Sequence, residues 1–272
     1  MIELICDKDQ TLKEFTENNC AQASFFWSYL LKNKEIKVNG KKIGEDILLR
    51  AGDSVRYYLT PKQEEKPAFS VVYRDENVLV VDKESGVNSE AVFAELSRKT
   101  GGRCAFIHRL DRNTRGLMVF ALTETAEKEL LLAFKEKRVE KKYYARCFGT
   151  FEKENDVLSA YLKKDGERSL VKIYDAPVKG AEKIVTEYRV LGFDGETSKA
   201  ELTLHTGKTH QIRAHLAHIA CPIVGDMKYG DTAKNKAKNI SRQCLVAKEL
   251  RFSLQGELAY LNDQTFVSSF DV

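Results

Sequence analysis

The chain has 272 residues, of which 43% are hydrophobic and 31% charged, and its formal net charge is +4. This composition is typical of a soluble globular protein of one or two domains. No apolar run approaches the ~20 residues that a membrane-spanning helix needs, and the first residues are too charged for a signal peptide. These features exclude a helical membrane protein, and the net charge alone is too small to indicate a nucleic-acid partner.

Six cysteines are scattered along the chain, and no two of them form a CxxC pair. Single cysteines within apolar stretches are typical of buried thiols in a reducing compartment. We therefore expect a cytoplasmic protein.

A charged stretch divides the chain. Pro61 and Pro67 enclose five residues without an apolar side chain, and prolines at both ends disfavour a helix. We expect a linker over residues 61–67, a small domain over 1–60 and a large domain over 68–272.

The small domain is predicted to contain two helices followed by short strands. Phe25, Phe26, Tyr29 and Leu30 recur at helical spacing, and Asn39-Gly40 is a strong hairpin signal within residues 35–43. Residues 51–59 are typical of a turn into a final strand. Five lysines gather around the hairpin, and they favour equally a solvated tip and a patch that contacts phosphates. They are Lys32, Lys34, Lys37, Lys41 and Lys42.

The large domain alternates strands and helices. Buried or alternating strands are expected at 77–82, 116–122, 142–149 and 200–205. One helix is expected after Thr123 or Thr125. A second is expected to begin at Thr209, to bury Ile212, Leu216 and Ile219, and to end before Pro222.

A polar loop at 107–116, IHRLDRNTRG, precedes one of these strands. Asp111 lies among Arg109, Arg112 and Arg115, and nearby cations favour an ionised carboxylate that can act as a nucleophile or a base. The alternative is an ion-paired loop in which Asp111 only organises a turn. The length of the motif favours the functional interpretation.

A second polar segment, TGKTHQIRAHLAH, covers residues 206–218. Arg213 is turned away from the predicted apolar stripe and can reach a carboxylate or a phosphate. His215 and His218 are expected on a solvated helix face. A metal site is not expected, because no acidic residue completes a ligand set with these histidines.

Basic residues mix with aromatic ones in a third segment, FKEKRVEKKYYAR, at residues 134–146. Six basic residues against two acidic ones suit contacts with RNA phosphates and bases. Tyr143 and Tyr144 must face opposite sides of a strand. The alternative is one core and one surface tyrosine.

Several blocks resemble the RluA-type pseudouridine synthases. Residues 108–117, HRLDRNTRGL, resemble the HRLDxxTSGLL signature, and residues 207–215 with 222–230 resemble a second signature. Lys142-Tyr-Tyr-Ala145 matches the segment that carries the active-site tyrosine, and residues 244–252 resemble a C-terminal block. The resemblance covers roughly residues 70–266. Residues 35–41 and 51–55 resemble, more weakly, an S4 RNA-binding domain.

The resemblance implies an α+β fold, with a mixed, mainly antiparallel central sheet, flanking helices and a small S4-like N-terminal domain. It implies an RNA pseudouridine synthase, an isomerase that needs no cofactor. The implied catalytic residues are Asp111 as nucleophile, Tyr143 against the base and Arg213 paired with the aspartate. The implied substrate-binding residues are Arg109, which fills the gap left by the extruded base, and His108, Ile212, Lys208, Thr209, His210 and Lys142.

Two positions depart from the family pattern. Arg115 stands where the family commonly has serine, and Lys83-Glu-Ser-Gly86 lacks the proline of a Lys-Pro-x-Gly block. They keep open a non-catalytic S4-type RNA-binding protein as the alternative, and a histidine-rich metal hydrolase is a third reading. The RNA class, ribosomal or transfer, also stays open. We expect a monomer.

Overall fold

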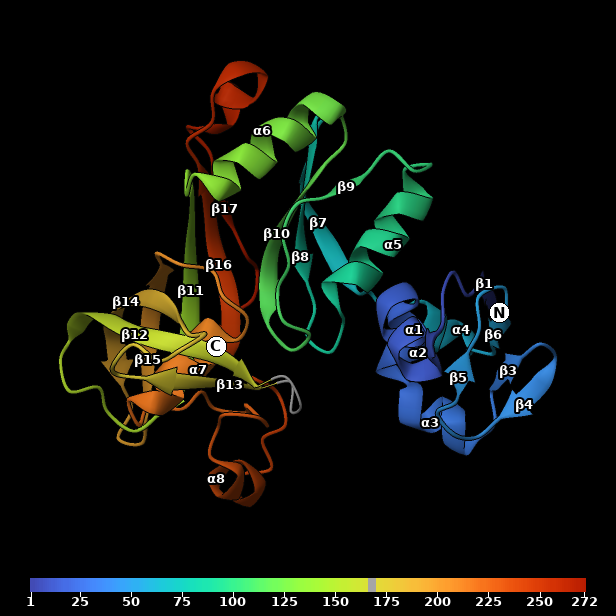
Figure 1. Ribbon diagram of the computed structural model, residues 1–272, viewed down its shortest axis with the longest axis horizontal. Helices are drawn as coiled ribbons and strands as arrows, with labels where there is room; N and C mark the ends of the chain where they lie inside the picture. The colour runs from blue at the N-terminus through green and yellow to red at the C-terminus, as the bar shows by residue number, and fades with distance from the viewer. Residues whose placement is uncertain (166–169) are drawn as a thin grey trace. The chain divides into compact units, whose positions relative to one another are not determined.

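The computed structural model describes residues 1–165 and 170–272. The chain forms two compact units, which Figure 1 traces from the blue N-terminus to the red C-terminus. The first unit comprises Met1–Arg112 and Met118–Glu124, and the second comprises Asn113–Leu117 and Thr125–Val272. Strand β10 (Arg115–Ala121) contributes residues to both units.

The N-terminal part of the first unit has its own small core. Its sheet has the order β1-β6-β3-β4, and a strand pair β2-β5 lies beside three helices. The core includes Leu12, Phe15, Leu30 and Tyr57. The bounds are β1 (Ile2–Ile5), β2 (Gln10–Thr11), α1 (Leu12–Asn19), α2 (Ala21–Phe25), α3 (Trp27–Lys32), β3 (Ile36–Val38), β4 (Lys41–Ile43), β5 (Leu48–Leu49) and β6 (Ser54–Tyr57).

The predicted hairpin is confirmed. Asn39 and Gly40 both have positive φ values, 49° and 81°, as the turn between β3 and β4 requires. The opening strand β1 was not predicted, because four alternating residues carry little pattern.

The stretch predicted as a linker begins with one helical turn, α4 (Pro61–Glu64). The expectation that proline disfavours helix here was wrong, because Pro61 occupies the first helical position, where its missing N–H costs nothing. The Thr60 amide donates to Gln63 Oε1 at 2.9 Å. A domain boundary at 61–67 stays a prediction.

The rest of the first unit surrounds a fully buried strand. Strand β8 (Val78–Lys83) pairs antiparallel with β7 (Phe69–Arg74), and every residue of β8 is buried. Helix α5 (Ser89–Lys99) packs against α1. Strand β9 (Ala105–Phe106) pairs with the end of β10.

The second unit is built on a twisted sheet with the order β13-β12-β14-β15-β11-β16-β10, and β17 pairs with β16. The pairings are antiparallel except β10 with β16, which is parallel. The expected α+β fold with a mainly antiparallel central sheet and flanking helices is confirmed. The strands are β11 (Val139–Phe148), β12 (Asn155–Asp165), β13 (Leu170–Tyr174), β14 (Glu182–Phe193), β15 (Thr197–Leu204), β16 (Leu245–Phe252) and β17 (Thr265–Val267).

Three helices accompany this sheet: α6 (Glu124–Lys135), α7 (Gln211–His218) and α8 (Thr232–Ala237). A 3-10 helix covers Gly256–Leu261. In the described part of the chain, no helix combines the length and the apolar character that a membrane crossing requires.

Candidate active site

The loop that carries Asp111 is fixed on both sides by buried polar contacts of the first unit. The Leu110 amide donates to Ser89 Oγ at 2.9 Å, and this hydroxyl lies 2.9 Å from the Leu110 carbonyl oxygen. Ser89 is fully buried at the start of α5. The Val119 amide donates to His108 Nε2 at 3.1 Å. Asp111 itself is half-buried, so a fixed backbone presents a carboxylate that keeps access to solvent.

Lys83 contacts the same loop, and the sequence had named it only within the Lys83-Glu-Ser-Gly86 block. Its side chain is fully buried at the end of β8, and its amine donates to the carbonyl oxygens of Glu84, Val87 and Arg112 at 2.8, 2.9 and 3.1 Å. Burial lowers the pKa of Lys83 to about 7, and the charge of Asp111 acts in the opposite direction. The sequence also shows a lysine at the end of an apolar strand, but neither signal indicated a buried amine.

The arginines beside Asp111 have carboxylate partners of their own. Arg109 pairs with Glu90 at 3.0 Å. Arg112 pairs with Glu17 and donates to Ser24 Oγ at 3.3 Å. These contacts stabilise the loop through ion pairs, as the alternative interpretation expected, but with partners that the charge pattern alone did not indicate.

Gly116 is the second residue of the buried strand β10 and lies at an unusually close approach of two strands. Its φ is 114°, and a Cβ added there would lie 2.3 Å from the Ala247 carbonyl oxygen. Only glycine fits this position.

Tyr143 and Tyr144 lie on opposite faces of β11, as the alternation requires. Tyr143 is buried and Tyr144 is half-buried. The strand pairs with β15 on one side and β16 on the other, with an irregularity between Lys142 and Tyr143 on the β16 side. The Lys142 amine lies 3.6 Å from Glu201. The interior of the sheet therefore fixes the backbone of the tyrosine implied for catalysis.

Arg213 forms a bidentate ion pair with a residue that the sequence did not single out. Its Nε donates to Asp226 Oδ2 at 2.6 Å, and a terminal nitrogen donates to Oδ1 at 3.0 Å. Burial alone would raise the pKa of Asp226, but the hydrogen bonds and charge of Arg213, with the amides of Lys228 and Tyr229, lower it overall. The guanidinium is thus held in one orientation by an ionised carboxylate.

The segment before α7 adopts a conformation that the sequence did not predict. The helix begins at Gln211 and not at Thr209, because His210 has a left-handed backbone with φ 55° and serves as the N-cap. The Tyr229 hydroxyl accepts from the Val171 amide at 2.9 Å and lies 2.9 Å from His210 Nδ1. Ile212 is buried, Thr209 is exposed, and Lys208 pairs with Glu182.

The expectation for His215 was wrong. Its side chain is buried, and Nδ1 lies 3.0 Å from Thr186 Oγ1 on β14. Burial, followed by the charge of His218, lowers the pKa of His215 to about 4. His218 is exposed and lies 2.7 Å from Asp175. The face of α7 that carries His215 is therefore buried against β14.

Among residues 1–165 and 170–272, no three His, Cys, Asp or Glu side chains are grouped so that they could hold a metal ion. Asp111, His108 and Arg109 belong to the first unit. The other implied site residues belong to the second, where Lys208, Thr209, His210, Ile212 and Arg213 cluster at the start of α7.

The fold and these motifs define an RNA-modifying isomerase. Residues 64–218 match the family described as RNA pseudouridylate synthase. Ribosomal large subunit pseudouridine synthase C of Vibrio cholerae is 30% identical over 74% of this chain and 70% of its own length. Ribosomal large subunit pseudouridine synthase D of Haemophilus influenzae is 28% identical over 83% and 74%.

Among solved structures, human RNA pseudouridylate synthase domain containing 1 is 28% identical, with a TM-score of 0.60, over 69% of this chain and 79% of that one. The chain belongs to the RNA pseudouridylate synthase family. It is therefore an isomerase that converts uridine in RNA to pseudouridine.

Proposed function

We propose that Asp111 is the nucleophile of this isomerisation. The observation that carries the proposal is the fixed loop: Ser89 holds Leu110, Lys83 holds the Arg112 carbonyl, and the half-buried carboxylate stands between them. Positioning a nucleophile in advance lowers the entropic part of its barrier.

The reaction exchanges the N1–C1′ bond of the uridine for a C5–C1′ bond. The target uridine leaves the base stack, at a cost of a few kcal/mol. Asp111 then forms a covalent bond to the nucleoside, and the N1–C1′ bond breaks. After the uracil rotates, C5 bonds to C1′ and the Asp111 bond breaks; the C5 proton leaves and N1, freed from C1′, takes up a proton. The balance needs no oxidant or reductant, and we propose no cofactor.

The remaining implied roles follow from residue chemistry. Tyr143 offers a ring that packs on the extruded uracil and a hydroxyl that takes part in proton transfer at C5. Arg109, with its exposed side chain, occupies the gap in the RNA stack, and Ile212 closes the pocket around the base. Lys142, His108, Lys208, Thr209 and His210 complete the substrate contacts.

We propose that Arg213 pairs with the Asp111 carboxylate. A guanidinium has five N–H donors in a rigid plane, and two of them are committed to Asp226. Because these two hydrogen bonds fix the orientation of the guanidinium, its remaining N–H donors point in a fixed direction.

The substrate that we propose is large-subunit ribosomal RNA, with transfer RNA as the alternative. The names of the Vibrio cholerae and Haemophilus influenzae relatives support this choice. The exposed lysines around the β3–β4 hairpin, including Lys34, Lys41 and Lys42, support a role of the S4-like part in holding the RNA backbone.

The decisive experiment measures tritium release from RNA labelled at uridine C5. Wild-type protein is expected to release tritium from large-subunit ribosomal RNA, and Asp111→Ala and Asp111→Asn are expected to release none. Comparable release from Asp111→Ala would exclude this nucleophile. Release only from transfer RNA would overturn the substrate assignment while leaving the nucleophile intact.

A further inference from the structure

A basic pocket of about 370 Å³ opens beside the start of β11 in the second unit. The turn that follows α6, the first residues of β11 and the ends of β15 and β16 contribute to its wall. Its charged side chains include Lys137, Arg138, Lys141 and Arg251, against the single carboxylate of Glu140. The implied catalytic roles use none of these residues.

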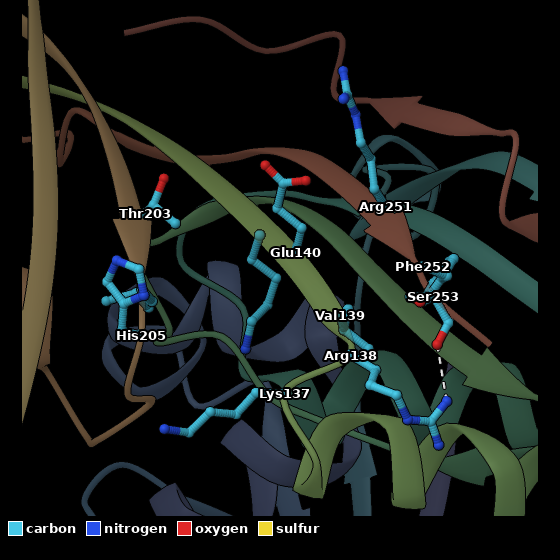
Figure 2. A pocket seen from close by; sticks show the side chains of 11 residues that line it. Lys137, Arg138, Val139, Glu140, Thr203, His205, Arg251, Phe252 and Ser253 are labelled. Atoms are coloured by element: carbon cyan, nitrogen blue, oxygen red, sulfur yellow. Dashed lines mark hydrogen bonds between the residues drawn. The ribbon is translucent and has the colours of Figure 1, made fainter.

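Both lysines that line the pocket stand apart from the internal ion pairs. Arg138 is committed to Glu136 and to the Ser253 carbonyl oxygen, both at 2.8 Å. Lys137 and Lys141 form no ion pair with a carboxylate of the described residues. In Figure 2 the Glu140 carboxylate points away from the Lys137 amine, and the His205 ring lies on the Lys137 side. The positive charge on this side of the pocket therefore comes from the lysine, since His205 lies 2.8 Å from the Glu187 carboxylate.

Lys141 is the less solvated of the two. Its amine lies 5.1 Å from the centre of the Phe134 ring, and burial lowers its pKa. A cation that has lost part of its hydration gains strongly from an anion brought into contact with it.

Lys137 holds a backbone conformation that lysine rarely adopts. It follows α6 with φ 59°, in a C-terminal turn where the Arg138 amide donates to the Ala133 carbonyl oxygen at 2.8 Å. Glycine is the usual residue there, because other residues are strained in the left-handed region. None of the contacts of the described residues offsets this backbone strain. A function of the lysine side chain would explain why lysine occupies this position.

The pocket residue Lys141 also lies on the same strand as Tyr143. Residues 139, 141, 143 and 145 lie on the same face of β11, since side chains alternate along a strand. Lys141 and Tyr143 are thus neighbours on one face, with Cα atoms roughly 7 Å apart.

We infer that Lys137 and Lys141 form a phosphate subsite for the RNA backbone, and that it binds a nucleotide flanking the target uridine. The inference rests on the proposed function of Tyr143. We assign the stronger phosphate contact to Lys141, which is half-buried, because its neighbour Lys142 already lies near Glu201.

Filter binding to a large-subunit ribosomal RNA transcript at several salt concentrations tests the subsite. Lys141→Gln and Lys137→Gly are each expected to weaken binding roughly tenfold and to lower the slope of log K against log salt by about 0.7–0.9. Lys141→Arg is expected to retain binding. The matched control is Lys128→Gln, an exposed lysine of α6 outside the pocket, which is expected to bind like wild type.

Lys137→Gly is expected to change the RNA affinity and the thermal stability of the protein in opposite directions. Its melting temperature is expected to rise by about 1–4 °C as the strain is relieved, while its affinity for RNA falls. Binding by Lys141→Gln and Lys137→Gly that equals the Lys128→Gln control would overturn the subsite. Because binding is read without turnover, this failure differs from an absence of tritium release, which would refute the proposed function instead.

Discussion

Arg213 and Asp226 form a buried bidentate ion pair in which only 7% of the arginine side chain and none of the aspartate side chain is exposed. The aspartate also accepts from the Lys228 and Tyr229 amides at 2.8 and 3.0 Å. The Asp226 carboxylate therefore fixes the orientation of Arg213, the arginine implied for catalysis. It also fixes the turn that follows Ile223, a residue of an isolated β-bridge.

Replacing this aspartate tests how much the pair stabilises the fold. Asp226→Asn keeps the size but leaves the Arg213 charge buried and uncompensated, so the free energy of unfolding is expected to fall by about 3 kcal/mol. Urea denaturation measures it. Asp156→Asn breaks an exposed pair with Lys153 and is expected to change nothing measurable. Equal stability of both variants would contradict the role of Asp226.

We predict that the titration of His215 destabilises the fold in mild acid. Its pKa is about 4 in the folded protein and 6.5 in the unfolded chain, so the unfolded state binds more protons between these values. Stability contributed by the neutral imidazole is present above pH 6.5 and is lost as the pH falls toward 4. Between pH 6.5 and 5 the free energy of unfolding should drop by about 2 kcal/mol from this group.

His215→Gln removes that titration. Urea denaturation at a series of pH values is expected to show a shallower decline for the variant than for wild type. Parallel curves would show that His215 is not the titrating group.

Gly116 predicts a steric test of the β10–β16 contact. Gly116→Ala places a methyl group against the Ala247 backbone and strains a φ of 114°, so it is expected to destabilise the fold by more than about 3 kcal/mol. Gly192→Ala is the control, since nothing lies within 4 Å of its added Cβ. The yield of folded protein and urea midpoints decide the comparison, and a wild-type midpoint for Gly116→Ala would contradict the register.

We predict that Arg115, which departs from the family pattern, stabilises the fold. Its guanidinium donates to the Asp271 carbonyl oxygen at 2.6 Å and lies 4.7 Å from the centre of the Phe270 ring. Arg115→Ser is expected to lose about 2 kcal/mol of stability and to retain tritium release at low temperature.

The double variant Arg115→Ser, Phe270→Ala identifies the partner. Its destabilisation is expected to be smaller than the two single effects added together, because the residues share one contact. Additive effects would place the partner of Arg115 elsewhere, and loss of turnover by folded Arg115→Ser would give the arginine a catalytic role.

Sequence patterns of short range determined much of this protein. The alternation in residues 142–149 and 200–205 predicted strands that exist, and Asn39-Gly40 predicted the hairpin turn, because a strand or a turn is specified by neighbours a few residues away. The long motifs around Asp111 and Arg213 identified the family for the same reason, since each is a continuous run.

The tertiary structure decided which groups meet. Helical periodicity placed His215 on a face, but only the packing of β14 showed that this face is buried against Thr186. The partners of Lys83 and Arg115 lie up to 156 residues away, in segments whose local pattern says nothing of the contact. Periodicity fixes the direction of a side chain within its own element, whereas burial and charge pairing depend on which distant element closes over it.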